Sequence, residues 1–253
     1  MAPLFQLNKL TKYFGSTTAV DDVNINIDRG EIIALIGSSG SGKTTLLKLL
    51  NGQHLSDQGD VILSGIAIKD HSNKELRQAR SKIAYIPQDL GLVKSLKAYQ
   101  NIFLGKIGRV STLKMLKRFL FPPKSELLIA HEILERVGIE DKLYNYTANL
   151  SGGQQQRVAV ARSLYQEAHT ILADEPISAV DPARARSLIK LLIEISRENN
   201  LTLIMSIHNI ELAQEFFPRI IGLKEGKVLF DKGEVNEQEL QELYQLNEEQ
   251  LTQ

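Results

Sequence analysis

The sequence of 253 residues contains no cysteine, which excludes disulfide bonds and thiol chemistry and suits a reducing compartment. It also lacks an excess of either charge, because 30 Lys and Arg residues balance 30 Asp and Glu residues. A chain without a net basic charge creates no overall field that attracts nucleic acid. We therefore expect no nucleic-acid partner.

Long apolar segments are missing as well. No apolar run approaches the ~18–20 residues that a helix needs to cross a bilayer. The first 14 residues lack the apolar block and the small-residue cleavage site of a signal peptide. Any membrane association is therefore expected to be peripheral. With 43% hydrophobic and 24% charged residues, the composition is that of an ordinary globular protein.

The most informative stretch is 31–50. Residues 32–36 form an apolar run that predicts a buried strand, residues 37–44 read GSSGSGKT and fit G-x-x-x-x-G-K-[ST], and leucines at helical spacing follow. The glycines allow consecutive N–H groups to point at a phosphate, and the helix start adds its positive end. Lys43 is placed to neutralise phosphate charge, and the Thr44 hydroxyl can ligate Mg²⁺. We predict that the chain binds a nucleoside triphosphate.

The segments around this loop predict antiparallel strands. Residues 4–28 alternate apolar and polar positions, and residues 56–68 form a hairpin pattern around Ser64-Gly65. Tyr13 and Phe14 lie about two dozen residues before the loop, next to Gly15. They are either half-buried strand aromatics or a flat surface on which an adenine could stack.

A change of pattern follows residue 88. Residues 83–86 predict a strand, Pro87 ends it, and Gln88 follows at the carboxyl end, where a doubly wound sheet places ligand contacts. Residues 89–165 then lose strand signals and predict an inserted helical lobe. Within it, 105–124 carries six basic residues and no acid, interleaved with Leu and Phe. This stretch is either a solvated basic helix with its apolar side on the lobe, or a surface close to anionic lipid or a membrane partner.

Two further stretches suggest phosphate chemistry. In LSGGQQQR, from 150 to 157, Ser151 is an N-cap type and two glycines leave the first N–H groups of a helix uncovered, which favours an anion. A strand over 170–173 ends in Asp174 and Glu175. We expect these carboxylates on opposite sides of an extended chain, with Asp174 in a Mg²⁺ shell and Glu175 orienting or deprotonating a water molecule.

The remaining chain predicts a helix capped by Asp181 and Pro182, a buried strand over 201–207 followed by His208, two strands within 219–230, and an acidic helical tail from 231. His208 is either structural or a sensor of the γ-phosphate. The other histidines have no neighbours at ligand spacing, so we predict no metal–histidine site.

Taken in order, these motifs resemble the ATPase subunit of an ABC transporter over roughly residues 4–233, and LSGGQ is the specific part because generic phosphate-loop ATPases lack it. The resemblance implies an α/β fold with a P-loop NTPase (RecA-like) core, an antiparallel β subdomain and an inserted α-helical subdomain. It implies a core at 1–88 and 166–233, a helical subdomain with the signature motif at 89–165, and an acidic C-terminal helical tail at 234–253.

The resemblance also implies roles for individual residues, with ATP and Mg²⁺ as cofactors. The implied nucleotide contacts are Phe14 (Tyr13 as the register alternative), Gly37, Ser38, Ser39, Gly40, Ser41, Gly42, Lys43, Thr44, Thr45, Ser151, Gly152, Gly153, Gln154 and Asp181. The implied metal ligands are Thr44, Gln88 and Asp174, and the implied catalytic residues are Glu175, His208, Gln88 and Lys43. No motif residue is missing, so we expect a hydrolysing enzyme.

The implied assembly is a head-to-tail homodimer with two sandwiched ATP molecules. It would dock against integral membrane permease subunits at the cytoplasmic face of the inner membrane, and a solute-binding protein would act indirectly. LSGGQQQRVAVARSL, ILADEPISAVDP and the basic stretch resemble bacterial phosphonate or phosphite importers. Importers of polar amino acids or methionine, and a non-transport ABC ATPase that regulates a membrane partner, remain alternatives. ABC ATPases acting on DNA or ribosomes, kinases and GTPases fit poorly.

Overall fold

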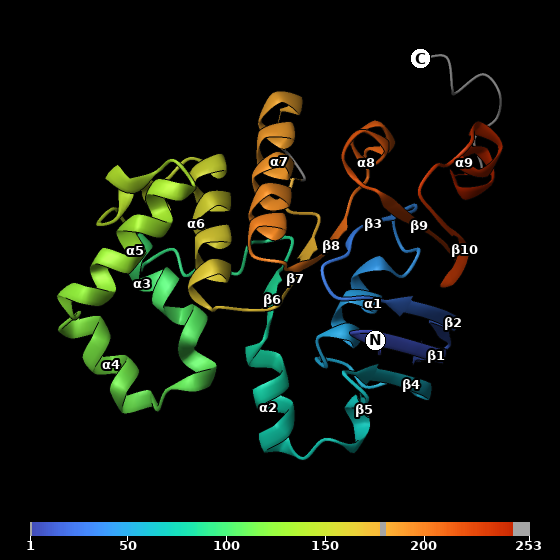
Figure 1. The fold of residues 1–253 in the computed structure, drawn as a ribbon, viewed down its shortest axis with the longest axis horizontal. Helices are drawn as coiled ribbons and strands as arrows, with labels where there is room; N and C mark the ends of the chain where they lie inside the picture. The colour runs from blue at the N-terminus through green and yellow to red at the C-terminus, as the bar shows by residue number, and fades with distance from the viewer. Residues whose placement is uncertain (1, 178–180, 245–253) are drawn as a thin grey trace.

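The structure, a computed structural model, describes residues 2–177 and 181–244. Residues 178–180 of the predicted cap before Asp181, and residues 245–253 of the predicted acidic tail, lie outside this description. The described chain forms two sheets with helices packed on and beside them (Figure 1).

The larger sheet has six strands in the order β10-β9-β3-β8-β7-β6. Its strands are β3 (Ile32–Ile36), β6 (Ile83–Ile86), β7 (Thr170–Asp174), β8 (Thr202–Ser206), β9 (Arg219–Lys224) and β10 (Lys227–Lys232). All neighbours pair in parallel except β10, which is antiparallel to β9. The predicted strands therefore exist, and the carboxyl ends of β3, β8, β7 and β6 lie at one edge.

The smaller sheet is antiparallel, with the order β2-β1-β4-β5, as the alternating pattern and the hairpin predicted. Its strands are β1 (Phe5–Phe14), β2 (Thr17–Ile27), β4 (Gln58–Leu63) and β5 (Ile66–Ala67). The inward side chains of this sheet pack with helix α1 (Lys43–Leu50) against one face of the larger sheet.

The larger sheet separates two hydrophobic cores. Along β3, Ile33 and Leu35 point into the core shared with the antiparallel sheet, while Ala34 and Ile36 point into the core shared with helices. Side chains alternate across a strand, so a strand that is apolar throughout fills a core on each face. This explains why β3, β7 and β8 are buried along their whole length.

Further helices cover or flank the sheets. They are α2 (Asn73–Ser81), α7 (Pro182–Glu198), α8 (Ile210–Phe216), α9 (Glu237–Tyr244) and the short η1 (Ile68–Asp70). Helix α7 has Pro182 in its first turn and Asp181 as N-cap, accepting from the Arg184 N–H at 3.0 Å, as predicted. The prediction of a helical tail from residue 231 is wrong in its start, because β10 continues to Lys232 by pairing with β9.

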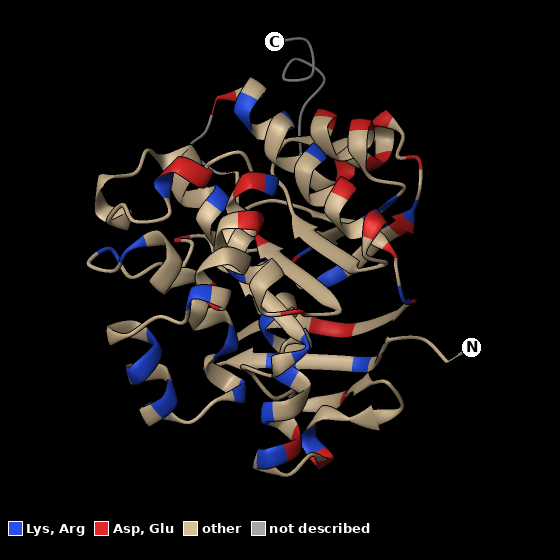
Figure 2. Ribbon diagram, turned by 60° about the vertical axis from the view of Figure 1, so that its left-hand side comes forward, with Lys and Arg blue, Asp and Glu red and all other residues tan. Residues whose placement is uncertain are grey.

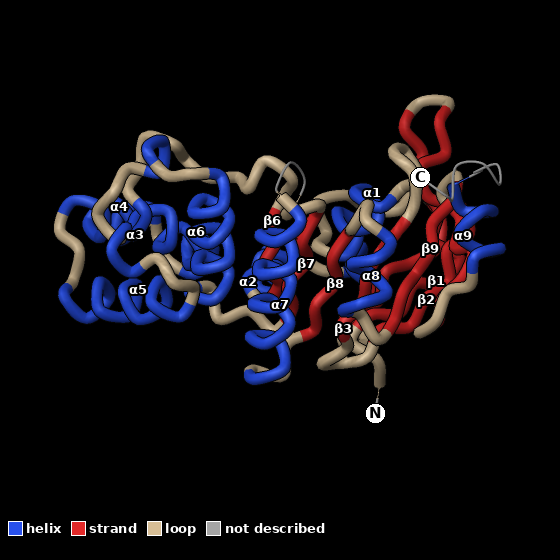
Figure 3. Tube along the Cα trace, turned by 90° about the horizontal axis from the view of Figure 1, so that it is seen from above, coloured by secondary structure: helices blue, strands red, loops and turns tan. Residues whose placement is uncertain are grey.

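Residues 89–165 contain helices and no strand, with one isolated bridge between Lys97 and Tyr146. The elements are α3 (Ala98–Phe103), η2 (Leu104–Arg109), α4 (Thr112–Leu120), α5 (Lys124–Arg136), η3 (Glu140–Lys142), η4 (Thr147–Asn149) and α6 (Gly152–Tyr165). They lie beside the sheets in Figures 1 and 3. Their apolar side chains join the same core as the helix-facing side of the larger sheet, and the division into domains stays a prediction.

Asn101 holds this helical segment together. Its fully buried side chain accepts from the Val93 N–H at 2.8 Å and donates to the Val93 carbonyl at 3.0 Å and to Thr147 Oγ1 at 2.8 Å. The Thr147 hydroxyl in turn donates to the Leu96 carbonyl at 2.9 Å. One amide on α3 therefore joins two other stretches of the chain, at Val93 and at Thr147, by hydrogen bonds.

We predict that Asn101→Ala lowers the free energy of unfolding by about 2 kcal/mol or more, because it leaves buried groups without partners. Urea denaturation measures this value. The matched control is Asn199→Ala, at an exposed position where the side chain makes a hydrogen bond to Ile195 O, and it should cost under about 1 kcal/mol. Equal losses in the two variants would contradict the role given to Asn101.

Candidate functional site

The loop between β3 and α1 requires its glycines. Gly37, at φ +150°, would place a Cβ 2.2 Å from the Leu223 carbonyl oxygen, and Gly42, at φ +105°, would place one 2.3 Å from that of Ala19. No side chain fits at either position. Ser38, Ser39 and Gly40 form the exposed mouth of the loop, in front of the first turn of α1.

Lys43 lies behind this mouth. It is only 4% exposed, and its ammonium donates to the carbonyls of Gly37 at 2.9 Å and Ser38 at 3.0 Å. Burial lowers the pKa of Lys43, and the attraction of Glu175 and Asp174 opposes this shift. The ammonium is also 3.9 Å from Glu175 Oε1. The Lys43 ammonium is thus held by carbonyl groups directly behind the loop.

Asp174, at the end of β7, accepts hydrogen bonds from hydroxyl groups of three other elements. Its Oδ1 accepts from Thr44 Oγ1 at 3.0 Å and from Ser206 Oγ at 2.8 Å, and its Oδ2 accepts from Tyr85 OH at 3.2 Å. The carboxylate is 3% exposed. Its paired oxygens and the Thr44 hydroxyl are hard oxygen donors, the kind that Mg²⁺ takes.

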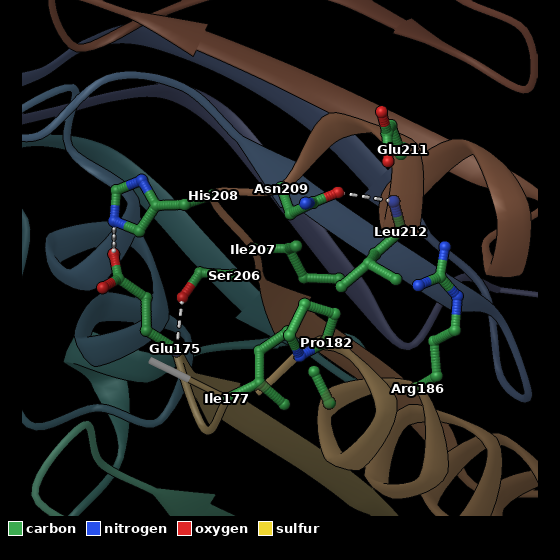
Figure 4. Close-up of a pocket in the computed structure, with 11 residues that line it drawn as sticks. Glu175, Ile177, Pro182, Arg186, Ser206, Ile207, His208, Asn209, Glu211 and Leu212 are labelled. Atoms are coloured by element: carbon green, nitrogen blue, oxygen red, sulfur yellow. Dashed lines mark hydrogen bonds and ion pairs between the residues drawn. The ribbon is translucent and has the colours of Figure 1, made fainter. Parts of the chain in front are cut away.

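Glu175 is held by polar groups on two sides. Its Oε1 lies 2.6 Å from His208 Nε2, and its Oε2 accepts from Gln88 Nε2 at 3.2 Å. Figure 4 shows the His208 contact, and the Glu175 N–H bonded to Ser206 Oγ at 2.8 Å. Glu175, Ser206 and His208 also border a pocket of about 220 Å³ between the end of β8 and the starts of α7 and α8.

The expectation that the two carboxylates point to opposite sides of an extended chain is wrong. Glu175 has a φ of +48°, so the chain leaves the strand geometry directly after Asp174. The Glu175 carboxylate lies 3.9 Å from the Lys43 ammonium, while Asp174 accepts from the hydroxyl groups of Thr44, Tyr85 and Ser206. A non-glycine residue in the left-handed region is strained, and such strain is typical of functional positions.

The parallel sheet explains why these residues meet. Strand β3 leads into the phosphate loop, β7 into Asp174 and Glu175, β8 into Ser206 and His208, and β6 into Gln88. These are four adjacent strands, and ligands of open α/β sheets bind outside their carboxyl ends. The structure thus brings together the predicted loop, Gln88, Asp174, Glu175 and His208.

Two residues at this edge were missed by the sequence analysis. Ser206 faces Asp174 in the strand register, and its hydroxyl joins the Asp174 carboxylate to the Glu175 N–H. Tyr85 approaches from β6, and burial together with Asp174 raises its pKa. The sequence did contain a signal for both residues, because each carries a hydroxyl group near the end of a strand that is otherwise mostly apolar.

The fit of a nucleotide can be judged from the loop itself. The buried Ser41 Oγ has no hydrogen-bond partner within the described chain, and the loop mouth is exposed. A buried hydroxyl and a desolvated ammonium beside a helix N-terminus suit a polyphosphate. Thr44 and Asp174 suit a divalent cation next to it.

The predicted signature residues do not join this cluster within one chain. Residues 151–154 start α6, which lies apart from α1 in Figures 1 and 3. Ser151 caps the helix by accepting from the Gln154 N–H at 3.3 Å, and the Gln154 side chain accepts from the Ser151 N–H at 2.9 Å. Asp181 likewise caps α7.

The two candidate aromatics both lie exposed at the end of β1, so the choice between them stays open. Phe14 packs edge-on against His54, with ring centroids 5.4 Å apart, and the Lys12 ammonium lies 5.6 Å from its ring. Tyr13 accepts from Gln58 Nε2 at 3.5 Å. Strand β2, which pairs with this end of β1, carries the Ala19 carbonyl against Gly42, so this end of the antiparallel sheet lies near the loop.

Helix α6, which begins at the signature residues, is hydrogen-bonded to the loops that follow Gln88 and Glu175. The Gln156 amide donates to the Pro176 carbonyl at 2.7 Å, directly after Glu175. Arg162 donates to the carbonyls of Leu90 at 2.7 Å and Gly91 at 2.6 Å, just after Gln88. Both loops that carry catalytic candidates are thus tied to one helix.

Comparison with known proteins adds to this geometry. A family profile described as ABC transporter matches residues 20–178. The chain is 40% identical over 250 residues to the phosphonates import ATP-binding protein PhnC 1 of Nostoc sp., covering 97% of this chain and 94% of the relative. It is 41% identical over 223 residues to PhnC of Frankia casuarinae, covering 88% and 87%.

Solved structures agree with the fold. The ATP-binding cassette MJ0796, in a dimeric post-hydrolysis state bound to ADP and Pi, is 33% identical, with a TM-score of 0.75 over 92% of this chain and 99% of that one. The cbiO1 subunit of Clostridium perfringens, part of the ABC transporter complex cbiONQ, is 28% identical, with a TM-score of 0.78 over 92% and 89%. The predicted P-loop NTPase fold is confirmed.

We predict that Ser206→Ala lowers ATP hydrolysis roughly tenfold to a hundredfold and raises the Mg²⁺ concentration needed for half-maximal rate. The Asp174 carboxylate loses a partner that orients it, and the Glu175 N–H loses its acceptor. Mg²⁺ titrations of the ATPase rate measure both effects, and Ser206→Thr should restore them.

The control for this variant is Thr202→Ala, a buried hydroxyl at the other end of the same strand that accepts from the Gly30 N–H at 2.9 Å. It should cost stability without changing the Mg²⁺ dependence. An unchanged Mg²⁺ dependence in Ser206→Ala would show that this hydroxyl supports the fold alone.

Proposed function

The chain belongs to the ABC transporter family, and from this we propose that it is the ATP-hydrolysing subunit of an importer that takes up a small phosphonate or phosphite through separate membrane subunits. The observation that carries the enzymatic part is the meeting of loop, Lys43, Asp174 and Glu175 at one sheet edge. The solute class is supported by the relatives, which are named phosphonates import ATP-binding proteins.

In the proposed reaction, the loop N–H groups and Lys43 bind the phosphates of ATP. Thr44 and Asp174 would hold Mg²⁺, with Gln88 as a further ligand, and the ion would supply charge neutralisation. Glu175 would orient the attacking water and take its proton, with the carboxylate held in place by Gln88 and His208. Lys43 would exchange its two carbonyl partners for phosphate oxygens.

We also propose that the working unit is a homodimer. The N-terminus of α6 is exposed and lies apart from the phosphate loop of its own chain, so a nucleotide could contact both only across two protomers. In a head-to-tail pair, Ser151 to Gln154 and Asp181 of one protomer would close on the nucleotide of the other. The related MJ0796 cassette has been solved as a dimer.

The proposed partners are integral membrane permease subunits and, through them, a solute-binding protein, at the cytoplasmic face of the membrane. Among the described residues, no helix combines the length and apolarity needed to span a bilayer. The division into a nucleotide-binding core, the helical subdomain at 89–165 and a C-terminal tail belongs to the same proposal.

We expect the variant Glu175→Gln to bind ATP with near wild-type affinity but to turn it over at least a hundredfold more slowly, because its amide cannot accept the proton of water. Slow turnover should trap a closed pair, so the mass in solution should double on adding ATP and Mg²⁺. Light scattering measures this mass.

Adding Ser151→Arg to Glu175→Gln tests the sandwich directly. The double variant should bind ATP equally well and stay monomeric, because the arginine would block closure. If Ser151→Arg instead lowered the ATP affinity of the isolated subunit, the signature residues would contact the nucleotide bound to their own chain, and the proposed dimer would be wrong.

The solute is tested with the membrane complex purified through a tag on this chain, reconstituted with its solute-binding protein. Methylphosphonate or phosphite should raise the ATPase rate severalfold, and methionine or glutamine should not. Activation by methionine alone would reassign the importer. A lack of response to every solute, with a permease bound, would favour a regulatory ATPase.

A further inference from the structure

Helix α4 presents its apolar side chains to solvent. The sequence left open whether this side packs on the helical lobe, but Leu113, Leu116 and Leu120 are 77%, 55% and 64% exposed, and Phe121, directly after the helix, is 74% exposed. The spacing i, i+3, i+7 places the three leucines on one stripe. The alternative in which the apolar side is covered by the lobe is therefore wrong for this stripe.

The opposite side of α4 fastens the helix to the protein. Met115 is buried in the core and Phe119 packs against it. The Arg118 guanidinium pairs with Glu126 at 2.8 Å, and Glu126 in turn accepts from Tyr165 OH at 3.1 Å. The exposed stripe thus sits on a helix with a fixed orientation.

Charge around the stripe has one sign. Lys114 and Lys117 lie exposed on the same helix, and neither makes an ion pair with any described residue. No acid occurs between residues 105 and 124. In Figure 2, the helix at the lower left carries blue bands and no red.

We propose that this face, defined by Leu113, Leu116, Leu120 and Phe121 with Lys114 and Lys117, binds the surface of an anionic lipid bilayer. A short amphipathic helix with a lysine-flanked apolar stripe lies in the interface plane, with its leucines among the acyl chains and its ammonium groups at the phosphates. A second copy of the chain is a poor occupant, because two such faces would bring lysines against lysines.

The inference does not depend on the proposed transport role. Helix α4 lies well apart from α1 and the phosphate loop in Figures 1 and 3, so the face can be tested without permease or nucleotide. Its failure would leave the ATPase assignment intact.

The test is cosedimentation of the full chain with vesicles of phosphatidylglycerol and phosphatidylcholine, or of phosphatidylcholine alone. The wild-type chain should partition to the anionic vesicles and be released by salt. Leu116→Ser/Leu120→Ser should lower partitioning more than tenfold, and Lys114→Gln/Lys117→Gln roughly tenfold.

Matched controls carry the same chemical changes elsewhere. Leu55→Ser/Ile66→Ser alters two exposed apolar residues near the antiparallel sheet, and Lys190→Gln/Arg197→Gln removes two charges from α7. Both should bind vesicles like the wild-type chain. Unchanged circular dichroism and ATP affinity would show that the α4 variants remain folded.

Because the chain has no cysteine, a single Leu116→Cys carries one environment-sensitive fluorophore. Its emission should shift to the blue on anionic vesicles, and that of a label at Leu55→Cys should not. Absence of wild-type binding, wild-type partitioning of the serine variant, or an unshifted label at 116 would each overturn the proposal. If the α4 variants failed to assemble with the permease but still bound anionic vesicles like the wild-type chain, the face would instead bind a protein partner.

Discussion

A buried carboxylate needs hydrogen-bond donors, and in this protein the donors of Asp174 come from three different elements. Thr44 belongs to α1, Tyr85 to β6 and Ser206 to β8, while Asp174 itself ends β7. An uncompensated charge at 3% exposure would cost several kcal/mol, so these elements are held in one arrangement. The start of α1 after the phosphate loop and the ends of β6, β7 and β8 are all joined by hydrogen bonds to this single carboxylate.

The residue after Asp174, Glu175, has a strained backbone and a carboxylate held by neighbouring side chains. Glu175 adopts a positive φ immediately after the buried strand, with its N–H fixed by Ser206 and its side chain fixed by His208 and Gln88. A conformation that a non-glycine residue rarely takes persists only where its surroundings determine it. The result is a carboxylate aimed at the loop and its lysine.

Much of this arrangement follows from local sequence, and some of it does not. Apolar runs identified β3, β7 and β8, and cap chemistry identified the starts of α6 and α7, because both depend on nearby residues. The role of Ser206 depends on the register of β8 against β7, and the φ of Glu175 depends on what surrounds it, so neither was predicted. The sequence likewise showed leucines and phenylalanine interleaved with the basic residues of 105–124 without indicating which of them the lobe covers.

The bonds of α6 to the two loops have a consequence for how such proteins can diversify. Arg162 and Gln156 donate to the backbone carbonyl oxygens of Leu90, Gly91 and Pro176, and every residue type supplies such an oxygen. Substitutions in these loops that keep the backbone path leave the attachment intact. The side chains of these loops can therefore change in evolution while helix α6 keeps its hydrogen bonds to both loops at this edge of the sheet.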